Sequence, residues 1–459
     1  MPDVKKKKKL KHRLGAVLFV IGIGAALMAI FLILRANGVL MQNTYKSSVV
    51  VISGISGLDT GSTNSSDDSS SGSSATLSAS AADTLSEYMA GLIKEDGTVD
   101  TAKVPQFCVY PLINDTRAFD TSVLTEKNVT ENNSRCLTAS EFKHILNCLY
   151  NKGFVLVRLR DLVDSVSGSG GSVKVTARTD FKLPDGKLPL LMTEEDVNYY
   201  HSWDNQGFAS KLVVQDGTVK AEYKNANGDV KVGDYDAVPI LESFISTHPD
   251  FSYNGARMTL ALTGYNGVLG YRTDTAYKTG SGLTDLQKTW LKNNPEFNYD
   301  QEVQNAKDTA AALLDEGYVF ANKTWGNRIV SSTSLKDLKD DNEEWKNTVE
   351  PITGTVDTVV FGHDSDISDK QGEYLLSNEK FAYYEEQGYH FFIANVRDGF
   401  AKQIFGGNYV YSACYGFTGY HLWMSHFGDS FAEAVMKFLG CDDIGIADSA
   451  RAESYEYVS

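Results

Sequence analysis

One histidine and two aspartates, His363, Asp364 and Asp366, follow the apolar run TVVFG at residues 358–362. Imidazole and carboxylate are ligands of zinc and similar ions. Together with Asp196, which follows an earlier apolar run, these side chains have the composition of a metal-ligand cluster. Asp and His at a turn after a strand are, however, more often solvated turn residues. We therefore expect a solvated turn here, with a metal site as the alternative.

Other reactive side chains show no spacing that indicates catalysis. No GxGxxG or P-loop phosphate motif is present, and no Ser-His-Asp constellation can be read from order or spacing. His421 and His426 suit neither a helical nor a strand-face metal pair, so we expect a surface or core role for them. His201, close behind Asp196, is expected to be a neighbour of the site rather than a ligand. The cysteines form no CxxC pair and are scattered, at Cys108, Cys136, Cys148, Cys414 and Cys441.

Apolar runs alternate with amphipathic segments from about residue 83 onwards. TASEFKHILNCLYNKG opens with a capping-box pattern, Thr138 and Glu141, and closes at Gly153, which predicts a helix between strands. Strands alternating with helices predict an α/β barrel or a layered sheet. Residues 208–234, with DG and NANGD turn signals, predict an inserted β-hairpin. The predicted buried strands are FCVYPLI (107–113), FVLVRL (154–159), LPLLMT (188–193), ARMTLALTG (256–264), YVFANKT (318–324), TVVFGH (358–363) and YHFFIANV (389–396).

The charge of the chain is distributed unevenly. The 459 residues include 43 Lys plus Arg against 59 Asp plus Glu, a formal net charge of −16. Residues 1–35 contain six Lys and two Arg against one Asp, so the remainder is more acidic than the whole. A body that acidic repels phosphate backbones. We therefore exclude nucleic acid as a partner and disfavour polyanionic substrates.

Residues 15–34 are uncharged apolar or Gly residues, about the length of helix that crosses a hydrocarbon core of roughly 30 Å. The basic residues before them predict that residues 1–14 are a cytoplasmic tail and that the rest is exported. A cleavable signal peptide is the alternative, but no clear cleavage site follows. The Ser-rich residues 35–82 are expected to be an extracytoplasmic linker, and residues 83–459 one barrel-sized domain. We expect a single-pass cell-membrane protein.

Three segments carry a resemblance to a known family: LPLLMTEEDVNYY, PDFSYNGARMTLALTGYNGVLGYRTD and LLDEGYVFANKTWGNR. Together they resemble the NodB-homology polysaccharide deacetylases, in particular a membrane-anchored Gram-positive subgroup. The similarity covers most of residues 100–425. It implies a distorted (β/α) barrel whose site lies at the carboxyl ends of the strands.

The resemblance also implies a specific chemistry. In the family a divalent metal polarises the acetyl carbonyl and lowers the pKa of a water, and a carboxylate takes the proton of that water. Glu195 stands in the position of this base, and Asp196 in that of the metal-binding aspartate. The family motif SHTWGH reads NKTWGN here, so Lys323 and Asn327 replace both ligand histidines. We therefore expect no cofactor and no hydrolysis, with a zinc-like ion held by Asp196 only if a metal site has been rebuilt.

The same alignment predicts that Lys323 pairs with Glu195 and Asp196 across the old metal pocket; the alternative is a solvent-exposed lysine. Further residues are candidates to line a cleft, because aromatic rings beside a cleft can stack on sugars. For Tyr199 and Trp325 ordinary packing is an equal alternative. The candidate cleft residues are Tyr199, Tyr200, Arg272, Trp325, His363, Asp364 and Asp366.

These expectations favour an anchored, extracytoplasmic protein that resembles a deacetylase, has lost hydrolysis and binds or presents a cell-envelope glycan of peptidoglycan type. Two alternatives remain open at this point. One is an active metal-dependent N-deacetylase with relocated metal ligands, and the other is a structural envelope protein without glycan affinity. Protein partners are not indicated by the sequence.

Overall fold

We describe the fold from a computed structural model, which describes residues 85, 87, 89–167, 173–395, 400–426, 430–441 and 451. The predicted cytoplasmic tail (1–14), membrane helix (15–34) and Ser-rich linker (35–82) lie outside the described residues. Among the residues that are described, no helix combines the length and the apolar character that a membrane crossing requires.

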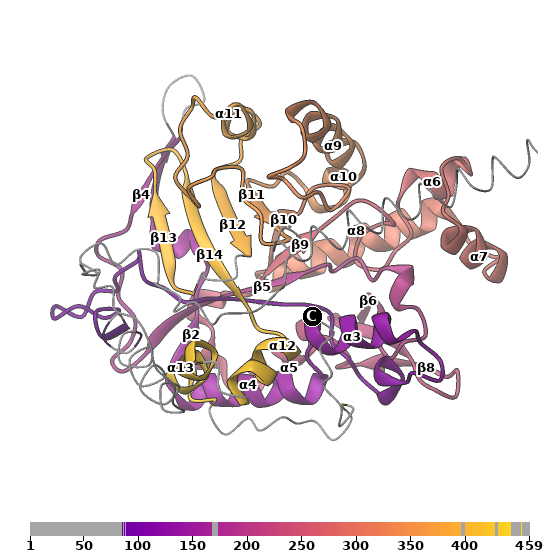
Figure 1. Ribbon diagram of the computed structural model, residues 1–459, viewed down its shortest axis with the longest axis horizontal. Coiled ribbons are helices and arrows are strands. Elements are labelled where there is room, and N and C mark those ends of the chain that lie inside the picture. The colour runs from indigo at the N-terminus through magenta and orange to yellow at the C-terminus, as the bar shows by residue number, and fades with distance from the viewer. Residues whose placement is uncertain are drawn as a thin grey trace, which may run out of the picture. The chain divides into compact units, whose positions relative to one another are not determined.

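Within this part of the chain, seven parallel strands close into a barrel, and the pairing of the first strand, β1, with β5 completes the ring (Figure 1). The α/β barrel expected from the sequence is therefore confirmed. In order around the ring the strands are β1 (Gln106–Val109), β14 (Val410–Gly416), β12 (Phe391–Asn395), β11 (Thr358–Phe361), β10 (Val319–Asn322), β9 (Thr259–Leu262) and β5 (Leu188–Glu195).

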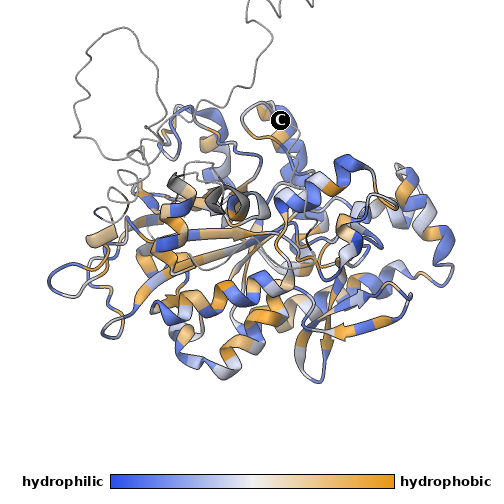
Figure 2. Ribbon diagram, turned by 60° about the horizontal axis from the view of Figure 1, so that its bottom comes forward, coloured by the Kyte–Doolittle hydropathy of each residue, from blue (hydrophilic) through white to orange (hydrophobic). Residues whose placement is uncertain are grey.

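Most barrel strands coincide with apolar runs of the sequence. Parallel strands are covered on both faces, so nearly all their side chains must be apolar. Every residue of β1, β11 and β14 is buried, and β5 is buried from Pro189 to Glu195. Figure 2 shows hydrophobic residues concentrated in these central strands. Each predicted strand is present, although β2 (Phe154–Leu156) lies outside the ring and pairs with β5. β14, which closes the ring beside β1, was not among the predicted strands.

Helices connect the strands and cover the barrel. The predicted capping box is present at the start of α4 (Ala139–Asn151), where Thr138 and Glu141 cap each other. α8 (Tyr299–Glu316) ends at Gly317, whose φ of 104° is left-handed, before β10 begins. The remaining helices are α3 (Glu126–Arg135), α5 (Ala237–Thr247), α6 (Thr275–Thr279), α7 (Asp285–Asn293), α9 (Leu335–Thr348), α10 (Glu350–Thr353), α11 (Glu379–Glu386), α12 (Gly419–His426) and α13 (Ser430–Leu439).

The predicted inserted hairpin is larger than expected. β6 (Ala209–Gln215) and β7 (Thr218–Lys224) form the hairpin, but β8 (Val230–Gly233) adds a further antiparallel strand. The three strands are called the meander below, and Figure 1 shows β6 and β8 near α3. β8 has only four residues and is exposed along most of its length, so its short Val-Lys-Val alternation is too brief to mark a strand. A further hairpin, β3 (Val163–Ser167) with β4 (Val173–Ala177), was not expected.

Two buried carboxyl groups, Glu194 of β5 and Asp236 at the start of α5, lie close together. Glu194 is fully buried, and Asp236 caps α5 by accepting hydrogen bonds from the backbone N–H groups of Leu112 (3.0 Å) and Ala237 (2.9 Å). Tyr199 donates its hydroxyl hydrogen to the second oxygen of Asp236. Burial raises the pKa of Glu194 well above its usual range and that of Asp236 to about 6, and the neighbouring Asp236 carboxyl adds to the rise at Glu194.

We predict that Glu194→Gln flattens the dependence of stability on pH. The folded-state pKa of Glu194 is raised, so the folded protein binds its proton more tightly than the unfolded chain does. The contribution of Glu194 to stability is therefore greatest at low pH and is lost as pH rises through this raised folded-state pKa. The free energy of unfolding, measured in urea at pH 5 and pH 8, should differ less in the variant, by about 1–3 kcal/mol. The exposed Glu343→Gln is the matched control, and an unchanged difference would contradict the prediction.

Candidate functional site

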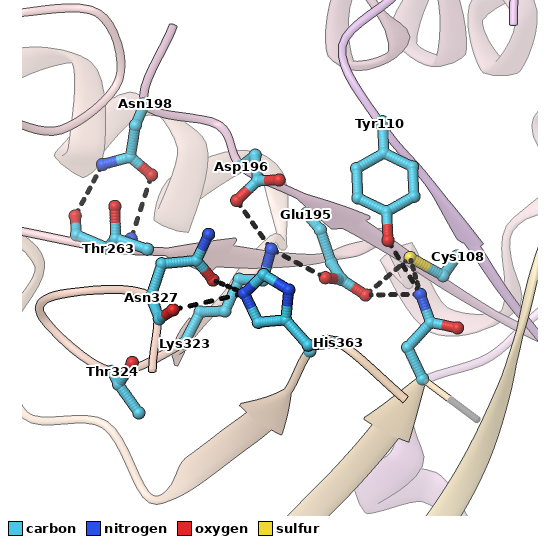
Figure 3. A network of polar contacts seen from close by, with 12 residues as sticks. Cys108, Tyr110, Glu195, Asp196, Asn198, Thr263, Lys323, Thr324, Asn327 and His363 are labelled. Atoms are coloured by element: carbon cyan, nitrogen blue, oxygen red, sulfur yellow. Dashed lines mark hydrogen bonds and ion pairs between the residues drawn. The ribbon is translucent and has the colours of Figure 1, made fainter. Parts of the chain in front are cut away.

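A buried ion pair lies at the carboxyl ends of β5 and β10. The Nζ atom of Lys323, the residue after β10, lies 2.6 Å from Oδ1 of Asp196 and 2.8 Å from Oε2 of Glu195. Figure 3 shows the ammonium between the two carboxylates. Lys323 is 4% exposed, Glu195 1% and Asp196 2%. The predicted ion pair is thus present, and its three members come from strands that are neighbours only through β9.

Lys323 and Asp196 keep their charges in spite of burial because each stabilises the charged form of the other. Burial alone would lower the pKa of Lys323, but the carboxylates of Asp196 and Glu195 outweigh it and raise the pKa. Burial would raise the pKa of Asp196, but Lys323 lowers it, with a smaller contribution from Arg135. Lys323 and Asp196 are therefore charged near neutral pH, and the ammonium stays protonated beside the carboxylates.

A second wall of the site, from β1 and β12, contacts the other oxygen of Glu195. Cys108 donates its S–H to Oε1 of Glu195 at 2.9 Å, and Asn395 donates its Nδ2–H to the same oxygen at 3.1 Å. Asn395 also donates to the Tyr110 hydroxyl at 2.9 Å, and Lys323 lies 5.8 Å from the centre of the Tyr110 ring. The sequence reasoning missed these residues. Their positions at or just beyond strand ends could have indicated them, because the residues of a barrel site come from the ends of several strands.

The loops that follow the strands hold unusual backbone conformations. Asp196, Thr324, Asn327 and His363 have left-handed φ values of 60°, 63°, 51° and 61°. A β-branched threonine rarely adopts this conformation, and such residues cluster at functional sites. Local hydrogen bonds stabilise Thr324, since its N–H donates to Oδ1 of Asn322 at 2.7 Å and its Oγ1 accepts from the backbone N–H of Arg328 at 2.6 Å. The strained loops fix the ends of β5, β10 and β11.

The ion pair also requires a glycine in the neighbouring strand end. A Cβ atom added to Gly362, which follows β11, would lie 2.9 Å from Cε of Lys323. Any larger residue would therefore push the lysine side chain away from the carboxylates. On the other side, the amide of Asn198 accepts from the backbone N–H of Thr263 at 2.9 Å and donates to its carbonyl at 2.5 Å, which ties the loop after β5 to β9.

The candidate metal ligands after β11 do not share one environment: His363 and Asp364 are exposed, whereas Asp366 is buried. The Nε2 atom of His363 lies 3.1 Å from Oδ1 of Asn327 at the exposed rim of the site, and Asp364 is exposed as well. Asp366 is buried in the opposite direction, where it accepts hydrogen bonds from the Tyr374 hydroxyl (2.9 Å) and the Gly372 N–H (2.9 Å). The hydrogen bonds of Asp366 within the described residues are therefore to its own loop, and none joins it to Asp196.

The candidate cleft residues are likewise only partly brought together. Tyr200 reaches the site, with its hydroxyl 3.2 Å from Oδ1 of Asp196 and 2.8 Å from Oγ1 of Thr263. Tyr199 is buried and bound to Asp236, and Trp325 donates its indole N–H to Oγ1 of Thr348 at 3.0 Å. Tyr199 is 2% exposed, and its hydroxyl is held by Asp236 rather than by a group of the ion pair. Arg272 lines a separate cavity, which also contains His201.

The residues present do not fit a zinc-like ion. Lys323 has no lone pair while it is protonated, and its ammonium lies within hydrogen-bond distance of the oxygens that a metal would use. Within the described part of the chain, no group of three or more His, Cys, Asp and Glu side chains is close enough to hold a metal ion. The groups in contact at this point are two carboxylates and one ammonium, and no imidazole stands among them to bind a cation.

The comparisons with known proteins give one remote likeness. No protein-family model and no curated protein matches the sequence. Among solved structures, the chain is similar in fold to the Streptococcus pyogenes deacetylase PplD in complex with acetate, with a TM-score of 0.34 and 11% sequence identity. The likeness covers 73% of this chain and 98% of that chain.

We predict that Lys323→Met destabilises the protein by about 3–5 kcal/mol at pH 7, because it leaves two buried carboxylates without a counter-charge. The loss should shrink towards pH 4, where the carboxylates can take up protons. Urea unfolding at both pH values measures it. Adding Glu195→Gln and Asp196→Asn should recover most of the stability, because no buried charge then remains.

Lys336→Met is the matched control for this prediction. Lys336 pairs with Asp340 on the exposed face of α9, so its loss should leave the urea midpoint almost unchanged. A Lys323→Met protein as stable as the wild type at pH 7 would show that the buried pair does not hold the strand ends together.

Proposed function

We propose that this chain is a polysaccharide deacetylase-like protein that binds cell-envelope glycan of peptidoglycan type without hydrolysing it. The observation that carries the loss of hydrolysis is the ammonium of Lys323 between Glu195 and Asp196. Removal of an N-acetyl group requires a Lewis acid for the carbonyl and a free carboxylate for the proton of water. Lys323 contacts one oxygen of each candidate carboxylate and has no electron pair to offer while protonated.

A row of aromatic rings supports the proposed glycan binding. The Tyr200 ring lies 5.5 Å from that of Trp203 and 5.6 Å from that of Tyr265, measured between centroids. Tyr265 is 39% exposed, and Tyr200 also contacts Asp196 through its hydroxyl. We call Tyr265, Tyr200 and Trp203 the aromatic row. Sugar rings bind to such faces through their apolar C–H surfaces, while the hydroxyl groups at the ring edge remain able to form hydrogen bonds.

The cellular setting belongs to the same proposal. Residues 15–34 are proposed to anchor the chain in the cell membrane, with residues 1–14 in the cytoplasm and residues 35–82 as a tether outside. The tether would place the barrel among envelope polymers. The negative net charge of the chain, −16, supports a partner that is not a nucleic acid.

The unmodified full chain, supplied with zinc, is expected to release no acetate from an N-acetylglucosamine oligomer, and to co-sediment with insoluble cell-wall glycan. Tyr265→Ala should reduce co-sedimentation, because it removes the exposed ring of the aromatic row. Lys307→Ala, on the surface of α8, is the matched control. Acetate release by the unmodified chain would contradict the loss of hydrolysis, and absence of co-sedimentation would contradict the glycan binding.

We further predict that Lys323→His together with Asn327→His creates zinc binding, with about one ion per chain by elemental analysis. The change removes the ammonium and adds two imidazoles beside Asp196, while His363 already contacts residue 327. Asp196→Asn in the same background should abolish the binding, since it removes the carboxylate ligand. A double-histidine chain that takes up no zinc would show that the ends of β5 and β10 no longer have the geometry of a metal site.

A further inference from the structure

A groove of about 850 Å³ lies between the meander, α7 and the short helix η4 (His201–Trp203). It is separate from the buried ion pair, since Glu195, Asp196 and Lys323 do not line it. We call it the meander groove. Its lining includes Trp203, Gln206, Lys211, Arg272, Trp290 and Asn294.

Arg272 offers an unused donor in this groove. The residue is 3% exposed, its Nη1 donates to the carbonyl of Tyr199 at 2.9 Å, and its Nη2 lies 3.8 Å from Oδ1 of Asp204. Its Nε–H has no hydrogen-bond partner among the described residues. Buried donors are almost always satisfied, so an unpaired guanidinium N–H in the lining of a groove indicates an acceptor that a ligand supplies.

The charges of the groove favour a neutral ligand. Its lining contains as many Lys and Arg side chains as Asp and Glu side chains, and they are interspersed. Glu222 lies 3.6 Å from Nζ of Lys211, and Glu302 accepts the backbone N–H of Arg272 at 2.9 Å. The carboxylates therefore remain beside the unused donor, where they would repel a phosphate or polyanion. A carbonyl or hydroxyl oxygen is therefore a better acceptor for the Nε–H of Arg272 than a phosphate oxygen.

The remaining lining has the chemistry of saccharide recognition. Trp203 and Trp290 line the groove and are half-buried, and the guanidinium of Arg272 lies 5.7 Å from the centre of the Trp290 ring. Between them stand amide side chains that both donate and accept, as hydroxyl groups require. These amides are Asn205, Gln206, Asn293 and Asn294.

The groove is continuous with the aromatic row. Trp203 belongs to both, because its ring lies 5.5 Å from that of Tyr200 and it also lines the meander groove. A chain of sugars that lies on Tyr265 and Tyr200 at the barrel end can therefore extend over Trp203 towards Trp290. The meander, which projects from the barrel between β5 and β9, supplies one wall of this extension.

We propose that the meander groove binds a neutral, N-acetylated oligosaccharide, with an acetamido carbonyl accepting the free Nε–H of Arg272 and a sugar ring on Trp290. The inference rests on the proposed glycan binding and locates a site for it outside the barrel. An oligosaccharide without acetyl groups offers no such carbonyl and carries ammonium groups in its place. It should therefore bind more weakly.

Isothermal titration calorimetry of the full chain with the N-acetylglucosamine tetramer tests the site. Trp290→Ala should weaken binding about ten-fold or more, because truncating an aromatic anchor removes the stacking surface. Trp290→Phe should restore most of the affinity. The glucosamine tetramer should bind the wild type more weakly than the acetylated one. Thermal unfolding of each variant checks that the fold is retained, and Lys307→Ala is the control.

The outcomes separate this inference from the proposed function. If Trp290→Ala binds as the wild type does while Tyr265→Ala binds more weakly, the groove is not the site, and the proposed glycan binding stands. If the wild type binds neither the tetramer nor cell-wall glycan, both fail. Equal affinity for the acetylated and deacetylated tetramers would overturn the contact between Arg272 and the acetamido group. A weakened Trp290→Ala with a recovered Trp290→Phe supports the site.

Discussion

An ammonium group enclosed by two carboxylates sets the character of this molecule. The three charges at Lys323, Glu195 and Asp196 are almost completely removed from water, so each depends on the others for compensation. The ammonium supplies the positive charge of a cation but not the vacant orbital of a Lewis acid. The barrel end is thereby electrostatically balanced by a hydrogen-bond donor rather than by an electron-pair acceptor.

The balance depends on the closure of the barrel. Glu195 receives the thiol of Cys108 from β1 and the amide of Asn395 from β12, which are far apart in the sequence. Gly362 after β11 leaves the space in which Lys323 lies, and Asn198 ties the end of β5 to β9. Because parallel strands present their carboxyl ends at one end of a barrel, residues from many parts of the chain meet there. The site is therefore a property of the whole ring rather than of any one motif.

The sequence predicted the elements whose signal is local. Continuous apolar runs marked the strands, and Thr138 with Glu141 marked the start of α4, because burial and capping leave a pattern in neighbouring residues. The ion pair of Lys323 was predicted from a family resemblance that aligned two strand ends. Tyr110 and Asn395 were missed because their role arises only from the pairing of distant strands. β8 was missed because its four residues are mostly exposed and too short to mark a strand. Arg272, named among the candidate cleft residues, lines the meander groove.

The pairing of β1 with β14 has a consequence for how the chain acquires its structure. Phe107 lies opposite Tyr415, so the first barrel strand finds one of its two neighbours only after almost the whole domain has been synthesised. Until then the edges of β1 and β12, which β14 will cover, expose unpaired backbone groups. Contacts between such distant segments form slowly and leave intermediates open to aggregation. We expect maturation to be limited by this last ring-closing step, so that helper proteins which shield strand edges would affect the yield of native protein more than its final stability.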